Sequence, residues 1–431
     1  MTTTPPPPDT DRQSALAREW DDLVEQVRRL PGFENFLRPP DIATMRSAAV
    51  GGPVVIVNVS RWRCDALVIR PEGVTEISLP DVTADSVVEE VNRYLHAVVS
   101  FQEESRLHQQ AQQALLGSGM DRPALATHAA AMRRWGRARE QTEAELNHCL
   151  VWMWDSFVER ILDHLQLTTP LGDTRPWPRL WWCPTGPLTL LPIHAAGRHS
   201  RPNEAVLDRV VSSYTPTLRA LIQSRAEDPV GALPAAHQML FVGMQRTPGQ
   251  PNLPNVQREQ QLLERLLPDR CLSLTEQAAT RAAVLEHLPG HTWVHFSCHG
   301  NQNLGDPSRG GLHLHDGMLT VGEVSAKEYQ GELAYLSGCK TAVGGVNLPD
   351  EAITLAASLN YSGYRHVIAT LWSVTDQHAA EVAEDVYGGL VHDGALDARD
   401  AGPALHRAVI SLRERYRDHP SVWMPYTHIG P

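Results

Sequence analysis

The stretch His295-Phe296-Ser297-Cys298-His299-Gly300 decides how this chain folds, together with Leu336-Ser337-Gly338-Cys339-Lys340-Thr341 further along. Each stretch follows an apolar run that is typical of a buried strand, and each ends in a turn of small residues. Because the carboxyl ends of neighbouring parallel strands meet at one edge of a sheet, we expect His299 and Cys339 to lie close together there. A paired imidazole and thiol is the arrangement that makes a thiolate nucleophile.

The region around these motifs predicts an α/β fold. From about residue 180, near-continuous apolar runs alternate with amphipathic helical patterns, which is typical of a parallel sheet with helices on both faces. A hairpin is expected at 311–321, around Asp316-Gly317. Strands are expected at 180–182, 239–243, 271–275, 293–298, 333–337, 366–371 and 424–429, and helices at 255–267, 279–288, 350–361, 377–392 and 402–416.

Residues 1–178 have a different pattern of apolar and polar residues. Residues 1–14 have the composition of a disordered leader, and residues 15–178 predict an α+β region before a domain that spans 179–431. This region contains a helix at 15–30, strands at 54–57, 64–69 and 74–79, and a long helical hairpin at about 84–166. The hairpin is interpreted either as scaffold or as an arm that binds a partner.

Composition and charge narrow the class of protein. The chain has 431 residues, a net charge of −12 and no long basic run, so direct nucleic-acid binding is not expected. Six cysteines at irregular spacing favour reduced thiols over a disulfide framework. The N-terminus lacks a basic start and an apolar core, and no apolar stretch is long enough to span a membrane. We therefore expect a cytoplasmic protein without a membrane anchor.

The residues beside the candidate thiol favour its ionised form. Lys340 follows Cys339, and a helix is expected to start soon after, so a cation and helix amides both stabilise a thiolate. The backbone amides of Gly300 and Cys339 are candidates for an oxyanion hole. The alternative is structural: Cys339 as a small buried apolar residue and His299 as a hydrogen-bonded core histidine.

Two other readings of the first motif remain. Cys298 is a rival nucleophile, but consecutive strand residues point to opposite faces, so we expect it to face the core. His295 is expected to be a core residue or to hydrogen-bond at the strand end. A zinc site would draw on His295, Cys298, His299, His313 and His315, whose spacing matches no closed zinc pattern. No metal and no cofactor are expected.

An acidic residue lies at the same expected edge. The strand at 367–371 runs into Trp372-Ser373-Val374-Thr375-Asp376 and then into a helix. Asp376 is interpreted either as a receptor for a basic substrate side chain or as a first-turn carboxylate that offsets the helix dipole. Asp350 and Glu351 have the same two readings. The Gly-rich loops 301–310 and 342–349 are expected to form the walls of a substrate cleft.

These motifs resemble the CHAT family of caspase-like cysteine peptidases, which are related to separase and more distantly to gingipains. His295–Gly300 is similar to the family's histidine motif, and Leu336–Ala342 to its cysteine motif. The segments 182–196, 367–376 and 423–430 are similar to the family's entry segment, its later strand and its closing strand. The resemblance covers the chain from about residue 180. Many relatives carry helical repeats before the peptidase unit, and none is found here.

The resemblance implies a cysteine endopeptidase with His299 and Cys339 as its dyad, Gly300 as an oxyanion donor and Asp376 as the receptor for an arginine. It further implies a protein substrate in bacterial defence, such as a gasdermin-like pore former or a conflict-system protein, and an inactive state released by a protein partner or by cleavage. The alternatives are a catalytically silent scaffold that binds a partner through the helical hairpin, and a zinc-dependent hydrolase.

Overall fold

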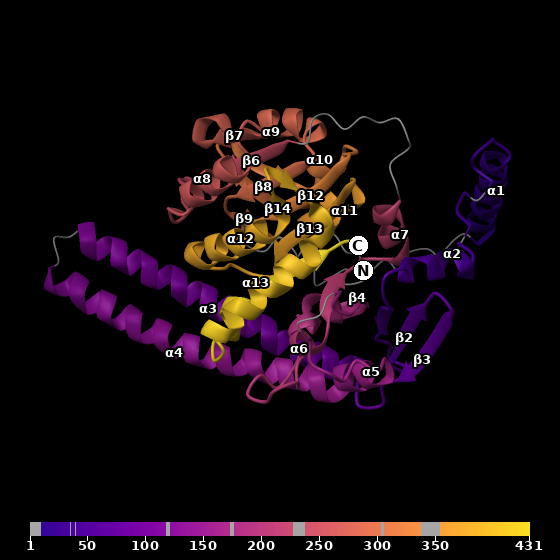
Figure 1. Ribbon diagram of the computed structural model, residues 1–431, viewed down its shortest axis with the longest axis horizontal. Coiled ribbons are helices and arrows are strands. Elements are labelled where there is room, and N and C mark those ends of the chain that lie inside the picture. The colour runs from indigo at the N-terminus through magenta and orange to yellow at the C-terminus, as the bar shows by residue number, and fades with distance from the viewer. Residues whose placement is uncertain are drawn as a thin grey trace, which may run out of the picture.

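A large, mostly parallel sheet organises the protein (Figure 1). The computed structural model describes residues 10–34, 36–38, 40–117, 121–172, 176–226, 238–302, 306–337 and 354–431. Within these residues the sheet has 11 strands in the order β3-β2-β1-β4-β5-β16-β13-β12-β8-β6-β7. Their bounds are β1 Val54–Asn58, β2 Asp65–Arg70, β3 Gly73–Ser78, β4 Arg179–Pro184, β5 Val211–Tyr214, β6 Met239–Gly243, β7 Cys271–Thr275, β8 Trp293–Ser297, β12 Gly331–Leu336, β13 Tyr364–Thr370 and β16 Tyr426–Ile429.

Five consecutive strands in this order, β13, β12, β8, β6 and β7, are parallel to one another. All five residues of β6 and of β8 are buried, as expected for strands that are covered on both faces. β16 joins this group antiparallel to β13 and is parallel to β5. The parallel α/β fold with helices on both faces is therefore confirmed, and the carboxyl ends of β8, β12 and β13 lie at one edge.

Alternate residues of the strands pack into two cores. Phe241 and Tyr335 belong to the core under α8 (Val256–Leu266), α12 (Asp376–Leu390) and α13 (Ala401–Arg415). Their strand neighbours Val242 and Leu336 belong to the opposite core, under α9 (Arg281–His287), α10 (Val321–Ser325) and α11 (Leu355–Tyr361). The period of two along each strand thus gives both faces an apolar surface to cover.

The N-terminal strands belong to the same sheet. β1 pairs antiparallel with β2 and parallel with β4, and β4 pairs with β5. Strands from before and after residue 178 therefore share one hydrogen-bonded sheet. Two short helices, α2 (Ile42–Arg46) and α7 (Leu218–Arg225), lie near this end, and α7 packs on Trp181 of β4.

The predicted helical hairpin is present and extends beyond the sheet (Figure 1). It consists of α3 (Ala84–Gly117) and α4 (Arg122–Met153), and the Asp121 side chain caps α4 by accepting from the amide of Ala124. α4 continues through a π-helical turn, Trp154–Val158, into α5 (Glu159–His164). The buried residues of both helices lie mainly at the base of the hairpin, where α4 packs against the rest of the protein.

The remaining elements complete the outline. α1 (Thr10–Arg28) lies at the opposite end of the molecule from the tip of the hairpin (Figure 1). A small sheet of β9 (Gly300–Asn301), β10 (Gly311–Leu314) and β11 (Gly317–Thr320) contains the predicted hairpin at 311–321. Shorter elements are α6 (Val206–Arg209), α14 (Pro420–Trp423), β14 (Val391–His392) and β15 (Ala395–Leu396).

None of the helices that the structure describes is both long and apolar enough to cross a lipid bilayer.

Candidate active site

The pairing of β8 with β12 sets the geometry of the candidate site. Leu336, the last residue of β12, pairs with Phe296 of β8, and Ser337 continues the ladder by donating its amide to the Phe296 carbonyl at 2.8 Å. His299 and Cys339 each follow a residue of this pair by three positions. The two strands are therefore neighbours, and they deliver the two sequence motifs to the same edge of the sheet.

Part of the second motif lies outside the described residues. The structure describes Ser337 and then resumes at Thr354. The predictions for Gly338 and Cys339, for Asp350 and Glu351, and for the loop 342–349 fall within that interval and stay predictions. The distance between His299 and Cys339 is among them.

A backbone carbonyl holds the imidazole of His299. Its Nε2 lies 2.7 Å from the carbonyl oxygen of Pro251. A carbonyl only accepts, so Nε2 carries the proton of the neutral ring and Nδ1 carries the lone pair. The His299 side chain is partly exposed. The structure thus presents a histidine of fixed tautomer whose other nitrogen can take up a proton.

The backbone after His299 leaves an amide available. The amide of His313 in β10 donates to the His299 carbonyl at 2.8 Å, and Gly300 pairs with Leu312. In this antiparallel pattern Gly300 and Leu312 form a non-hydrogen-bonded pair, so the Gly300 amide points away from β10. This orientation is compatible with a donor to a substrate oxygen.

Asp376 opens α12 and is held by the segment before α8. Its Oδ2 accepts from the backbone amide of Asn255 at 2.7 Å and from the Asn255 side-chain amide at 2.6 Å. Burial raises the pKa of Asp376, while the two bonds from Asn255 and the nearby His299 hold the pKa down. Asp376 therefore lies near His299 at the carboxyl edge. It also occupies the first turn of α12, as the helix-dipole reading expects.

A buried network lies directly beneath this edge. Glu259 of α8 is 3% exposed, and its two carboxylate oxygens accept from Ser337 Oγ at 2.7 Å and from His295 Nε2 at 3.1 Å. The Tyr387 hydroxyl of α12 donates to His295 Nδ1 at 2.9 Å. The His295 ring is stacked between Phe241 and Tyr335. Every polar atom of the carboxylate and the imidazole is thus satisfied, as burial requires.

The structure shows the surroundings of the other candidate residues in and near the first motif. His295 is fully buried in this network, and Cys298 is 1% exposed in the core on the α9 face of the sheet. Burial lowers the pKa of His313, and the neighbouring His299 lowers it further. Among the described residues, no group of three His, Cys, Asp or Glu side chains is placed to hold a metal ion.

Residues 251–259 contribute contacts that the sequence reasoning did not assign. Pro251 holds His299, Asn255 holds Asp376, and Glu259 holds Ser337. One signal was present: Glu259 lies on the apolar stripe of its helix, three residues after Val256 and four before Leu263, where a carboxylate would be buried. The two contacts made by Pro251 and Asn255 carry no comparable signal, because a carbonyl and a polar residue before a helix are common in loops.

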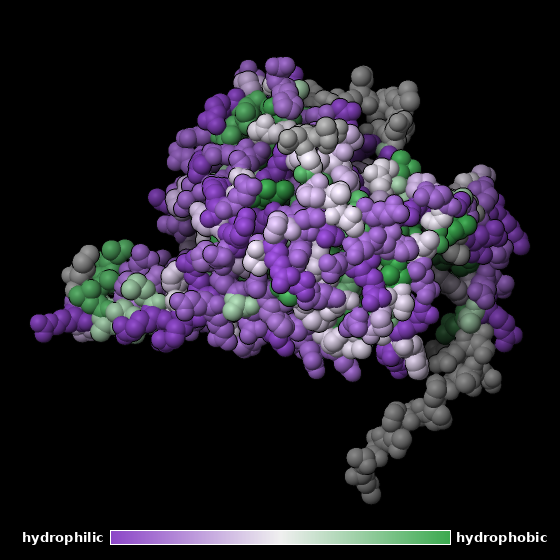
Figure 2. Space-filling view, turned by 60° about the horizontal axis from the view of Figure 1, so that its bottom comes forward, coloured by the Kyte–Doolittle hydropathy of each residue, from purple (hydrophilic) through white to green (hydrophobic). Residues whose placement is uncertain are grey.

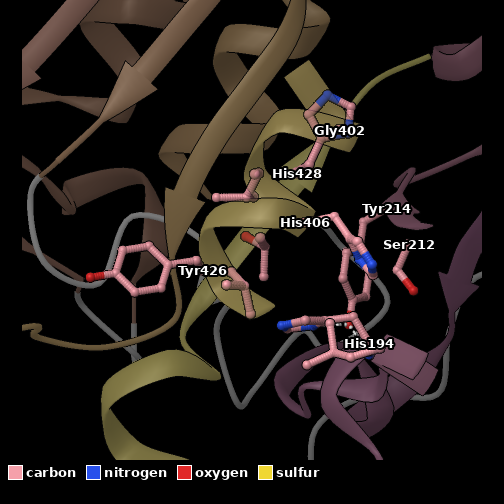
Figure 3. Close-up of a pocket in the computed structure, with 11 residues that line it drawn as sticks. His194, Ser212, Tyr214, Gly402, His406, Tyr426 and His428 are labelled. Atoms are coloured by element: carbon pink, nitrogen blue, oxygen red, sulfur yellow. Dashed lines mark hydrogen bonds between the residues drawn. The ribbon is translucent and has the colours of Figure 1, made fainter. Parts of the chain in front are cut away.

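A second group of histidines lies elsewhere, around a cavity between β5, β16 and α13 (Figure 3). The cavity has a volume of about 20 Å³, enough for one water molecule. Burial lowers the pKa of His194 to about 4 and that of His406 to about 3. His194 uses both ring nitrogens, on the Tyr214 hydroxyl and on the Met424 carbonyl. A cavity of this size has no room for a peptide substrate.

A comparison with protein families identifies the chain. The model of the CHAT domain matches residues 147–431. The chain belongs to the CHAT family. Its match begins within α4, so it includes the last part of the helical hairpin as well as the sheet from β4 onward. No curated protein matches the chain in a sequence search.

Solved structures place the CHAT protein's fold among the caspase-like cysteine peptidases. It is similar to separase of Saccharomyces cerevisiae, in its complex with securin, with a TM-score of 0.57 and 9% identity. That alignment covers 90% of this chain but only 30% of the separase chain. RgpB of Porphyromonas gingivalis aligns with a TM-score of 0.45 and 10% identity, over 67% of this chain and 68% of RgpB. At these identities the likeness shows the fold.

Proposed function

We propose that this CHAT protein is a cysteine endopeptidase that uses His299 and Cys339 as its dyad. The observation that carries the proposal is the register of β8 and β12, which brings a tautomer-fixed, partly exposed histidine to the edge where the cysteine motif begins. Family membership and the separase-like fold support the same activity.

In the proposed reaction Nδ1 of His299 takes the proton of the Cys339 thiol, and the resulting thiolate attacks the scissile carbonyl carbon and forms a tetrahedral intermediate. The amides of Gly300 and Cys339 donate to its oxyanion, and one such donor is worth roughly 3 kcal/mol of barrier. As the C–N bond breaks, His299 gives a proton from Nδ1 to the leaving amine. Water then attacks the thioester, His299 takes a proton from it, and the peptide acid and the thiol are released.

We propose Asp376 as the receptor for a basic side chain just before the cleaved bond. Asn255 donates both of its bonds to Oδ2 and so fixes the carboxylate, and we propose Oδ1 as the oxygen that receives the ligand. A planar guanidinium pairs well with a carboxylate held in this way. The expected preference is for arginine over lysine.

The biological setting follows from the family by analogy. We propose a cytoplasmic enzyme whose substrate is another protein in a bacterial defence system, such as a gasdermin-like pore former or a conflict-system protein. We further propose that it stays inactive until a protein partner binds or an exposed loop is cut.

A thiol-labelling experiment tests the proposal. Native protein and a Cys339→Ala variant are treated with a peptide electrophile that ends in arginine, and the modified residue is located by mass spectrometry. Labelling at position 339 alone supports the enzyme. The other thiols form a built-in control: Cys64, Cys149, Cys183 and Cys298 are buried, and burial raises the pKa of Cys271 to about 11.

Hydrolysis of an Arg-ending reporter peptide completes the test. Native protein should cleave it, the Cys339→Ala variant should not, and an Asp376→Ala variant should lose its preference for arginine. Absence of labelling and of hydrolysis in the native protein, with a suspected activator present, would favour the silent scaffold instead. An unchanged preference in the Asp376→Ala variant would place the receptor for the basic side chain elsewhere.

A further inference from the structure

Helix α1 carries an apolar stripe that its own chain leaves uncovered. Leu16, Trp20 and Leu23 are 57%, 59% and 51% exposed, although tryptophan and leucine are usually buried. Together with Val27 they are spaced four, three and four residues apart along α1, which is the a/d spacing of a coiled-coil seam. A seam of this kind is built to pack against another helix.

Helix α4 carries a second uncovered seam near the end of the hairpin. One side of α4 already faces α3, where His128 and Trp135 contact His108. On another side, Leu125 and Met132 are 45% and 50% exposed. With Ala129 and Gly136 they again follow the coiled-coil spacing of four, three and four. Figure 2 shows a hydrophobic patch at the end of the hairpin. Leu116, near the end of α3, is 67% exposed.

Neither the packing nor the backbone conformation at position 136 requires a glycine. A Cβ atom at this position would meet nothing within 4 Å, and its backbone is ordinary helix. Glycine within a helix costs roughly 0.5–1 kcal/mol relative to alanine. Beside Ala129 it leaves a shallow place on the seam of α4, which a large side chain such as an indole can fill.

The two seams are complementary in charge. Residues 122–139 of α4 contain five arginines and no acidic residue, and among the described residues Arg122, Arg133 and Arg137 form no ion pair. Residues 15–26 of α1 contain four acidic residues and one arginine. Glu19 directly precedes Trp20 and flanks the apolar stripe of α1, while Asp21, Asp22 and Glu25 lie further round the helix. Flanking charges of this kind select the partner helix in a coiled coil.

We propose that α1 of one copy of this chain docks on the outer seam of α4 of a second copy. The two surfaces lie at opposite ends of the molecule, so the contact is made between copies (Figure 1). In the complex Trp20 packs over Gly136, and Arg133, which flanks the seam of α4 directly after Met132, lies beside Glu19. Because each copy offers both surfaces, the contact is head-to-tail and extends into a chain or closes into a ring.

This proposal is tested by measuring the self-association of the purified full-length protein. The result does not depend on whether the protein is an active peptidase. Sedimentation velocity should show assemblies that grow with concentration. Trp20→Asp and Met132→Asp variants should each be monomeric, with association weakened roughly 30-fold or more because the centre of the contact is lost. A Trp62→Asp variant is the matched control: Trp62 is 79% exposed but lies on neither seam, so this variant should assemble normally.

A mixing experiment identifies which surfaces meet. Each single variant keeps one intact surface, so an equal mixture of Trp20→Asp and Met132→Asp proteins should form a one-to-one dimer that grows no further. Arg133→Glu and Glu19→Arg variants should each associate weakly, and a double variant that carries both changes should regain association. Circular dichroism confirms that the variants are folded. Native protein that stays monomeric, a Met132→Asp variant that still assembles, or a mixture without the dimer would overturn the proposal.

Discussion

Two histidines, His299 at the carboxyl edge and His194 beside β16, are held by the same kind of hydrogen bond. They differ in the surroundings of their second ring nitrogen. Each donates from Nε2 to a backbone carbonyl, that of Pro251 or that of Met424. In His194 the second nitrogen is already bonded to Tyr214, and the ring is 5% exposed. In His299 the ring is partly exposed, and none of the described residues forms a hydrogen bond with Nδ1. A carbonyl bond fixes a tautomer, and access to the other nitrogen decides whether the histidine can exchange protons.

The largest expected effect is on catalysis at His299. Replacement by alanine should lower hydrolysis of an Arg-ending peptide by about 10² to 10⁴-fold, the usual range for a lost general acid–base group. The melting temperature should hardly change, because the side chain is at the surface of the edge. A His315→Ala variant, on the neighbouring exposed turn, should retain its activity. Equal activity in the His299→Ala and His315→Ala variants would show that His299 is not a member of the dyad.

Replacement of His194 should have the opposite profile. In a His194→Phe variant the Tyr214 hydroxyl keeps the backbone amide of residue 194 but loses the ring nitrogen that accepts its proton, and the Met424 carbonyl loses its donor, at a cost of about 1–3 kcal/mol for each lost bond. We expect the free energy of unfolding to fall by about 3 kcal/mol, as measured with urea, while the kcat of the folded enzyme stays unchanged. A large loss of kcat at full stability would contradict the distinction between the two histidines.

The pH dependence of stability should sharpen the comparison. Burial lowers the pKa of His406 to about 3, against 6.5 for a free imidazole. Below pH 6.5 the unfolded chain therefore binds a proton at His406 that the folded chain does not bind. The free energy of unfolding falls for this reason as the pH drops towards 3. At pH 5 this single group costs about 2 kcal/mol. A His406→Leu variant should lose that much less stability than the native protein between pH 7.5 and pH 5.

The smallest effect is expected at Asn255. Asn255→Ala removes the side-chain bond to Asp376, so the pKa of Asp376 should rise and unfolding should become easier by about 1 kcal/mol. Asp376 would then be neutral over a wider acidic range, and the KM for an arginine peptide should increase first at low pH. A KM that shifts equally at all pH values would show that Asn255 does not act through the charge of Asp376.

The strands of the sheet were predictable because their apolar runs are nearly continuous. β6 and β7 have the predicted limits, and β8 ends one residue earlier than predicted. β5 was not predicted: its sequence Val211-Ser212-Ser213-Tyr214 is short and half polar, and it is stabilised by its neighbours in the sheet. The π-helical turn at 154–158 was also missed, because one extra residue in a turn leaves no mark on the apolar pattern.

The site was predictable only where a motif follows a strand. The positions of His299, Gly300 and Asp376 follow from strand ends, and the structure places His299 and Asp376 near each other. The supporting contacts from Pro251 and Asn255 come from a loop more than 40 residues earlier, and only the three-dimensional fold brings that loop to the edge. For Cys339 the register of β12 gives the edge, and its side-chain geometry stays a prediction.

The position of β16 has a consequence for biosynthesis. Strands β3 to β5 and strands β13 to β7 are joined in the sheet only through this strand, which is formed by residues 426–429. A ribosome releases the N-terminal residues first, so the two blocks of strands emerge long before the piece that unites them. The edge that carries His299 therefore belongs to a complete sheet only after residues 426–429 have been synthesised. On the proposed function, a nascent chain should not yet be able to cleave other proteins.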